Sequence, residues 1–140
     1  MGSHDTYGKD VLRTAAGKAF LDWGPSVEVM YGAGRPARVD GTVAGTIAVE
    51  IESRTSKQVR GAVLDLLFHP YPKKLLVLLP MYMSDCSTCA DQCRHALRRF
   101  VKAEDFRVVV LNGTGNTASL SADAQVVTTA LRELGFQGSD

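Results

Sequence analysis

The sequence has 140 residues, of which 45% are hydrophobic and 22% are charged, with a formal net charge of +1. This length and composition are typical of a folded domain with its own core, which excludes an intrinsically disordered chain. No apolar run approaches the roughly 20 residues that a membrane-spanning helix needs, and the N-terminus lacks the apolar core of a signal peptide, so we expect a cytoplasmic protein without a membrane partner.

Residues 1–5 are interpreted as the remnant of an expression tag or a disordered tail, and residues 6–136 as a single domain. Within that domain, apolar residues at spacings of three and four predict a first helix over 7–23. Gly24 and Pro25 follow directly and are expected to end it.

Three short runs with strand character come next, over 27–31, 37–43 and 46–53, separated by turn residues. The third run alternates most clearly, with apolar residues on one face and Ala48, Glu50 and Glu52 on the other. Because the connecting loops are short, we expect an antiparallel meander.

A second helix is expected to begin at Thr55 or Ser56 and to stop at His69-Pro70. The apolar pattern predicts the remaining elements in this order: a strand over 75–79, a helix over 85–102, a strand over 106–111 and a last helix that ends near Gly135. The order α-β-β-β-α-β-α-β-α indicates an α/β fold in which helices flank a mixed central sheet.

Three acidic residues of the meander are candidates for a divalent-metal site. Glu50 and Glu52 are two residues apart on one strand, so both carboxylates leave the same face, and Asp40 lies on the preceding strand. Carboxylates that converge repel one another unless a cation lies among them, and oxygen ligands suit Mg²⁺ or Mn²⁺. The alternative is that Glu50 and Glu52 line a solvated face of the sheet.

The elements around Val39-Asp40 and Glu50-Ile51-Glu52 resemble the core of the PD-(D/E)XK nuclease superfamily, over roughly residues 7–80. The resemblance implies a restriction-endonuclease-like α-β-β-β-α-β core and metal-dependent hydrolysis of phosphodiesters in DNA. It assigns metal binding to Asp40 and Glu50. Glu52 stands where the family usually has Lys, a variant in which the Glu is thought to bind metal or act as a base.

The resemblance leaves open which group assists the attacking water in place of that Lys. Lys57 and Gln58, on the first turn of the next helix, are the nearest substitutes. Some members of the family use an additional acidic residue from the first helix or strand, for which Asp22 and Glu28 are candidates.

A local basic patch follows the acidic strand. Arg54, Lys57 and Arg60 recur at a spacing of three near a helix N-terminus, whose N–H groups also favour phosphate. We therefore consider them candidates for binding the nucleic-acid backbone, against the alternative of a solvated helix face. A homodimer would supply the second active site that cleavage of both strands needs.

Two other classes of protein remain open. One is a catalytically inactive nucleic-acid-binding or assembly protein on the same fold. The other is a thiol redox protein that uses Cys86 and Cys89, because cysteines at a helix N-terminus can have a low pKa. Zinc binding by these residues with Cys93 and His95 is a further alternative, although helical spacing places Cys89 and Cys93 on a buried face, where thiols are unreactive.

Overall fold

The computed structural model describes residues 3–54, 56–80, 83, 85–113 and 117–138. Its helices are α1 (Ser3–Ala16), α2 (Ser56–Phe68), α3 (Cys86–Arg98) and α4 (Thr117–Glu133). Its main sheet contains β1 (Phe20–Leu21), β4 (Gly41–Val43), β5 (Ile47–Glu52), β6 (Lys73–Leu78) and β7 (Phe106–Val110). A separate hairpin consists of β2 (Glu28–Val29) and β3 (Ala37–Arg38).

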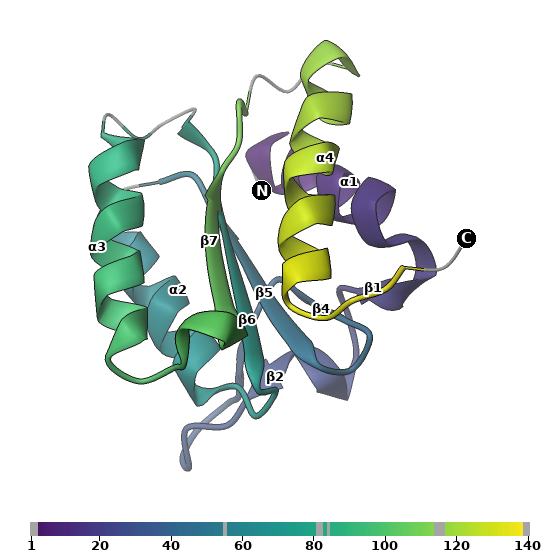
Figure 1. The fold of residues 1–140 in the computed structure, drawn as a ribbon. Coiled ribbons are helices and arrows are strands. Elements are labelled where there is room, and N and C mark those ends of the chain that lie inside the picture. Colours follow the sequence, from purple (N-terminus) through teal and green to yellow (C-terminus); the bar gives the residue numbers. More distant parts are fainter. Residues whose placement is uncertain (1–2, 55, 81–82, 84, 114–116, 139–140) are drawn as a thin grey trace.

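The five strands of the main sheet lie in the order β1-β4-β5-β6-β7. The pairs β1–β4 and β4–β5 are antiparallel, whereas β5–β6 and β6–β7 are parallel. Helices α1 and α4 cover one face of this sheet, and α2 and α3 cover the other (Figure 1). The expectation of a mixed α/β fold with flanking helices is therefore confirmed.

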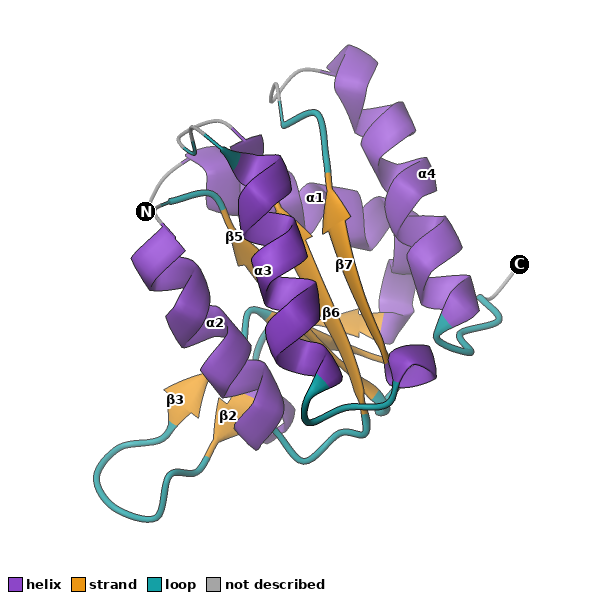
Figure 2. Cartoon of the chain, turned by 60° about the vertical axis from the view of Figure 1, so that its left-hand side comes forward, coloured by secondary structure: helices purple, strands orange, loops and turns teal. Residues whose placement is uncertain are grey.

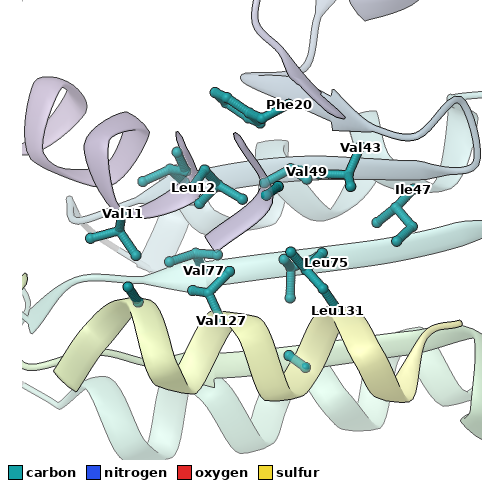
Figure 3. Packing of buried hydrophobic residues seen from close by; sticks show 14 of the residues in the cluster. Val11, Leu12, Phe20, Val43, Ile47, Val49, Leu75, Val77, Val127 and Leu131 are labelled. Atoms are coloured by element: carbon teal, nitrogen blue, oxygen red, sulfur yellow. The ribbon is translucent and has the colours of Figure 1, made fainter. Parts of the chain in front are cut away.

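Both faces of the central strands are buried, which explains their nearly continuous apolar sequences. On one face, Val11 and Leu12 of α1 and Val127 of α4 pack against β5 and β6 (Figure 3). On the other face, apolar residues of α2 and α3 pack against the alternate residues of the same strands, Ala48 among them. The alternation predicted for the third strand is thus confirmed, with both of its faces covered.

The first helix ends earlier than its apolar pattern predicts. Gly17 has a φ of +59°, a left-handed conformation that favours glycine and ends α1 at Ala16. Phe20 still reaches the core, but from strand β1 and not from a helix. Trp23, assigned to the same apolar stripe, is 70% exposed. The prediction of a helix over 7–23 is therefore wrong beyond Ala16.

The predicted meander also differs in its first two strands. The run over 27–31 contributes β2, which pairs with β3 in the hairpin and not with the main sheet. The run over 37–43 divides into β3 and β4 on either side of Val39-Asp40. Figure 2 shows this hairpin extending from the base of the molecule beside α2. The antiparallel pairing of β4 with β5 is as predicted.

Within the described residues, no helix has both the length and the apolar character needed to span a membrane.

Candidate functional site

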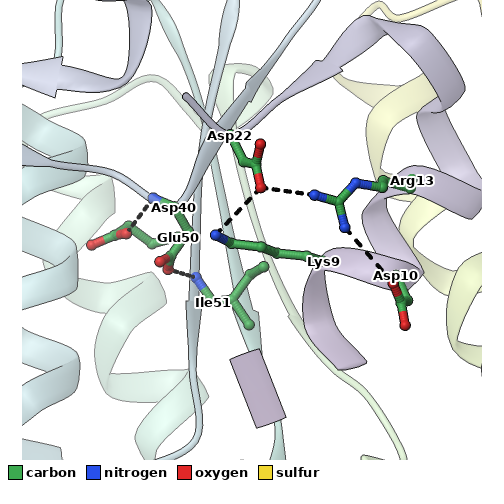
Figure 4. Close-up of polar contacts among 7 residues, drawn as sticks. All are labelled: Lys9, Asp10, Arg13, Asp22, Asp40, Glu50 and Ile51. Carbon is green, nitrogen blue, oxygen red and sulfur yellow. Dashed lines mark hydrogen bonds and ion pairs between the residues drawn. The ribbon is translucent and has the colours of Figure 1, made fainter. Parts of the chain in front are cut away.

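Asp40 and Glu50 lie side by side where β4 begins. The register pairs Gly41 with Val49, which brings the preceding Asp40 level with Glu50. The backbone N–H of Asp40 donates to Glu50 Oε1 at 2.9 Å, and the backbone N–H of Ile51 donates to Asp40 Oδ2 at 2.7 Å (Figure 4). Each carboxylate is thus fixed by the backbone of the other strand.

Gly41 allows β4 to lie close to β1. A Cβ at this position would overlap the Phe20 ring and lie 2.9 Å from the carbonyl oxygen of Leu21. Any larger residue would therefore push β4 away from β1. Because Gly41 directly follows Asp40, such a shift would also move the carboxylate that faces Glu50.

Glu50 is a buried acid in an environment that opposes its charge. Its side chain is 6% exposed, which excludes the alternative of a solvated sheet face for this residue. Burial, followed by the charge of Asp40 and a hydrogen bond between the two side chains, raises the pKa of Glu50 to about 10. In the absence of a cation, the Asp40–Glu50 pair therefore retains a proton at neutral pH.

Glu52 is buried as well, but its carboxylate is neutralised by Arg54. The guanidinium donates from Nε to Glu52 Oε2 at 2.9 Å and from Nη2 to Oε1 at 3.1 Å. The backbone N–H groups of Ser53 and Arg54 donate to the same Oε2, each at 3.0 Å. Burial alone would raise the pKa of Glu52, but these contacts with Arg54 and Ser53 lower it on balance.

A polar cavity of about 400 Å³ opens between β5, the end of β3 and the side of α2. It is lined by Arg38, Asp40, Glu50, Ile51, Glu52, Arg54, Gln58, Gly61, Ala62 and Asp65. The acidic pair and the Glu52–Arg54 ion pair therefore border one space. The three predicted carboxylates thus line one cavity, but within the described residues they do not form a group of three that could hold a metal ion.

Four lining residues were not recognised as site residues in the sequence: Arg38, Gly61, Ala62 and Asp65. Asp65 accepts a hydrogen bond from the Tyr31 hydroxyl at 2.5 Å, and its charge contributes to the raised pKa of Glu50. Its spacing of seven residues from Gln58, two helical turns, was a usable signal. Arg38 was also detectable, because it precedes Asp40 by two residues.

The residues of the predicted basic patch are placed differently from one another. Arg54 lines the cavity, as does Gln58, which is one of the two candidates to replace the Lys of the family. Arg60 is exposed on another side of α2, where it borders an apolar groove between α2 and α3. The side chain of Lys57 lies outside the described part of the structure.

Neither Asp22 nor Glu28, the two candidates for an additional acidic residue, lines the cavity. Asp22 forms ion pairs with Arg13 at 2.7 Å and with Lys9 at 3.4 Å, as Figure 4 shows. Glu28 is exposed on β2, opposite Arg38 in the hairpin register.

The donor set fits a divalent cation that keeps part of its water shell. In the part of the chain that the structure describes, no three or more His, Cys, Asp and Glu side chains are grouped to hold a metal. Mg²⁺, however, is commonly bound through one or two carboxylates, with water and substrate oxygens completing its shell. Asp40 and Glu50 supply two such carboxylates at the border of the cavity.

The three cysteines are buried, as helical spacing predicted for Cys89 and Cys93. Burial, followed by the neighbouring Cys89, raises the pKa of the Cys86 thiol, and the same causes raise that of Cys93 to about 12. A thiol with a raised pKa is a poor nucleophile at neutral pH. These environments do not favour redox chemistry.

No protein-family model, curated protein or solved structure matches this chain significantly.

Proposed function

We propose that the protein hydrolyses phosphodiester bonds in DNA with the help of Mg²⁺ or Mn²⁺, as an endonuclease. The observation that carries this proposal is the buried Asp40–Glu50 pair facing a polar cavity. A buried carboxyl group with a pKa of about 10 is held at a considerable electrostatic penalty, and such groups cluster at functional sites.

Asp40 and Glu50 would hold the cation, which would replace the proton that the pair carries without metal. When bound, a divalent ion neutralises charge on the scissile phosphate and lowers the pKa of a coordinated water. The hydrogen bonds from Asp40 N and Ile51 N fix the two carboxylates before substrate arrives, so little reorganisation is needed.

Glu52 and Arg54 receive a joint role. The carboxylate of Glu52 orients the guanidinium of Arg54 through two hydrogen bonds, at the border of the same cavity. A guanidinium oriented in this way can donate hydrogen bonds to a phosphate in a fixed geometry. We therefore assign Glu52 to the positioning of Arg54, and Gln58 to hydrogen bonding with substrate or water.

The arrangement of the strands supports the narrower proposal of a restriction-endonuclease-like core. Strands β1, β4 and β5 are antiparallel neighbours, and β6 lies parallel to β5 after the crossover through α2. Helix α1 lies on the opposite face from α2 (Figure 1). The acidic pair lies between β4 and β5, where the resemblance places the metal ligands.

The test is cleavage of supercoiled plasmid and of single-stranded DNA with Mg²⁺ or Mn²⁺. We expect metal-dependent cleavage by the wild type and a loss of at least about a hundredfold in Asp40→Asn and Glu50→Gln. Glu104→Gln, at an exposed acid outside the cavity, is the matched control and should retain activity. Binding of DNA without cleavage in any metal would instead favour the inactive binding protein.

A further inference from the structure

The side of α2 that borders the cavity is formed by residues at helical spacing. Gln58, Gly61 and Asp65 follow one another at intervals of three and four, so they lie along one face of the helix. This face forms one wall of the space above Glu50. A molecule that fills the cavity therefore lies against this face of α2.

Gly61 is unexpected at this position. It lies inside α2, five residues after its first residue and seven before its last. Glycine is among the least favourable residues in a helix interior, because it has the most backbone freedom to lose. Gly61 is not among the residues with a positive φ, so the backbone conformation does not require glycine here.

Packing inside the protein does not require glycine at this position either. A Cβ built on Gly61 has nothing within 4 Å among the described residues. By contrast, a Cβ on Gly8 would lie 2.5 Å from Ile51 Cγ2, so that glycine is explained by a contact within the chain. Gly61 instead keeps the cavity wall flat towards the space outside the chain.

Positive charge borders the same space. Arg38 lies on β3 and Arg54 lies two residues after the end of β5, and both line the cavity with Gly61. Both arginines are exposed, whereas the acidic lining residues are buried or partly buried, with Glu50 only 6% exposed. An anionic chain with a narrow profile fits a cavity with a flat wall and a cationic rim.

We propose that the sugar–phosphate backbone of one DNA strand packs against α2 at Gly61, with its phosphates held by Arg38 and Arg54. This inference rests on the proposed function and specifies how the substrate reaches the site. The absence of a side chain at Gly61 lets the backbone approach the helix closely. We take this strand to be unpaired, because the buried acidic pair is reached through a cavity of only about 400 Å³.

The experiment compares wild type with Gly61→Ala and Gly61→Leu. Both substitutions replace glycine by better helix formers, so they should raise the melting temperature by about 3 °C. Ala122→Leu is the matched control, since Ala122 is exposed on α4, across the sheet. Binding of a short fluorescein-labelled single-stranded oligonucleotide is followed by anisotropy in EDTA, which separates binding from cleavage.

We expect Gly61→Ala to weaken binding about threefold and Gly61→Leu at least about tenfold, because added atoms displace the strand from the wall. Ala122→Leu should bind as the wild type does. Equal affinity of the wild type and both Gly61 variants would overturn the proposal, as would tighter binding of duplex than of single strand. Cleavage by the same samples in Mg²⁺ is recorded separately: wild type that binds the oligonucleotide but never cleaves it contradicts the proposed function and not this surface.

Discussion

Asp40 and Glu50 are joined by a hydrogen bond of 2.9 Å from the backbone N–H of Asp40 to Glu50 Oε1. The Asp40 carboxylate in turn accepts from Ile51 N at 2.7 Å. The two acids are therefore fixed by backbone atoms on neighbouring strands and cannot separate without disturbing the sheet. Burial, followed by the charge of Asp40 that this geometry holds nearby, raises the pKa of Glu50.

The first prediction concerns stability against pH in the metal-free protein. Glu50 has a pKa of about 10 when folded and 4.5 as its ordinary value, so the folded state binds more protons between these values. Its contribution to the free energy of unfolding is fully present below about pH 4.5 and is lost as pH rises towards 10. Glu50→Gln removes this loss. The free energy of unfolding of Glu50→Gln, relative to that of wild type, should therefore rise by at least about 2 kcal/mol from about pH 5 to about pH 9.

Urea denaturation in EDTA at those pH values measures this difference. Glu104→Gln, at an exposed acid, should follow the wild-type pH dependence. Parallel pH profiles of the free energy of unfolding for wild type and Glu50→Gln would contradict the raised pKa of Glu50, on which the proposed site rests.

The second prediction concerns the ion pair between Glu52 and Arg54. Because the pKa of Glu52 is lowered, its stabilising contribution is present above its ordinary pKa of 4.5 and is lost as pH falls through the folded value. Arg54 is 55% exposed, so solvent limits the effect, and Arg54→Ala should lower the free energy of unfolding by about 1 kcal/mol at neutral pH. The difference should shrink in acid. Arg98→Ala, at an exposed arginine on α3, is the control. If Arg54→Ala lowers the free energy of unfolding by the same amount at about pH 3 and about pH 7, this ion pair is ruled out.

The third prediction concerns a buried acid away from the cavity. Asp123 on α4 is 1% exposed and accepts from the Tyr7 hydroxyl at 2.5 Å, from Asn112 N at 2.8 Å and from Gly113 N at 3.2 Å. Asp123→Ala would leave buried donors without an acceptor and should destabilise the protein by about 3 kcal/mol. Tyr7→Phe removes one of these bonds and should cost about 1 kcal/mol.

Chemical denaturation measures both variants and their combination. Because the two side chains share one network, the double variant should be only slightly less stable than Asp123→Ala alone. Ser121→Ala, an exposed change on the same helix, should have little effect. Additive losses would mean that Tyr7 and Asp123 act independently.

The fourth prediction concerns the cysteines. Because burial raises the pKa of Cys86 and Cys93, the native thiols should react with a disulfide reagent at least about a hundredfold more slowly than those of the unfolded protein. The rate at about pH 8, with and without denaturant, measures this protection. Rapid labelling of the native protein, or a reversible Cys86–Cys89 disulfide, would revive the thiol redox alternative.

The sequence predicts much of the fold because most signals are local. Alternation along β5 and the His69-Pro70 stop of α2 depend only on neighbouring residues, and both are found. The early end of α1 was missed because Phe20 is apolar whether it continues a helix or enters a strand. The pairing of β1 with β4, a contact distant in sequence, places Phe20 in a strand.

The candidate site could be predicted in its elements but not in its contacts. The positions of Asp40 and Glu50 follow from strand register, which the short turn between β4 and β5 constrains. The capture of Glu52 by Arg54 depends on side-chain conformations that no periodicity specifies. Arg60 was grouped with Arg54 by spacing, but the burial of Val59 and Val63 sets the rotation of α2 and turns Arg60 towards the groove beside α3.

The most direct test of the central claim is a titration with Mn²⁺, followed by calorimetry or electron paramagnetic resonance. Wild type, Asp40→Asn, Glu50→Gln and Glu52→Gln are compared at equal protein concentration. We predict saturable binding by wild type and Glu52→Gln and its loss in Asp40→Asn and Glu50→Gln, because only that pair supplies the ligands. No saturable binding by wild type, or equal binding by Glu50→Gln, would contradict a metal site at Asp40 and Glu50.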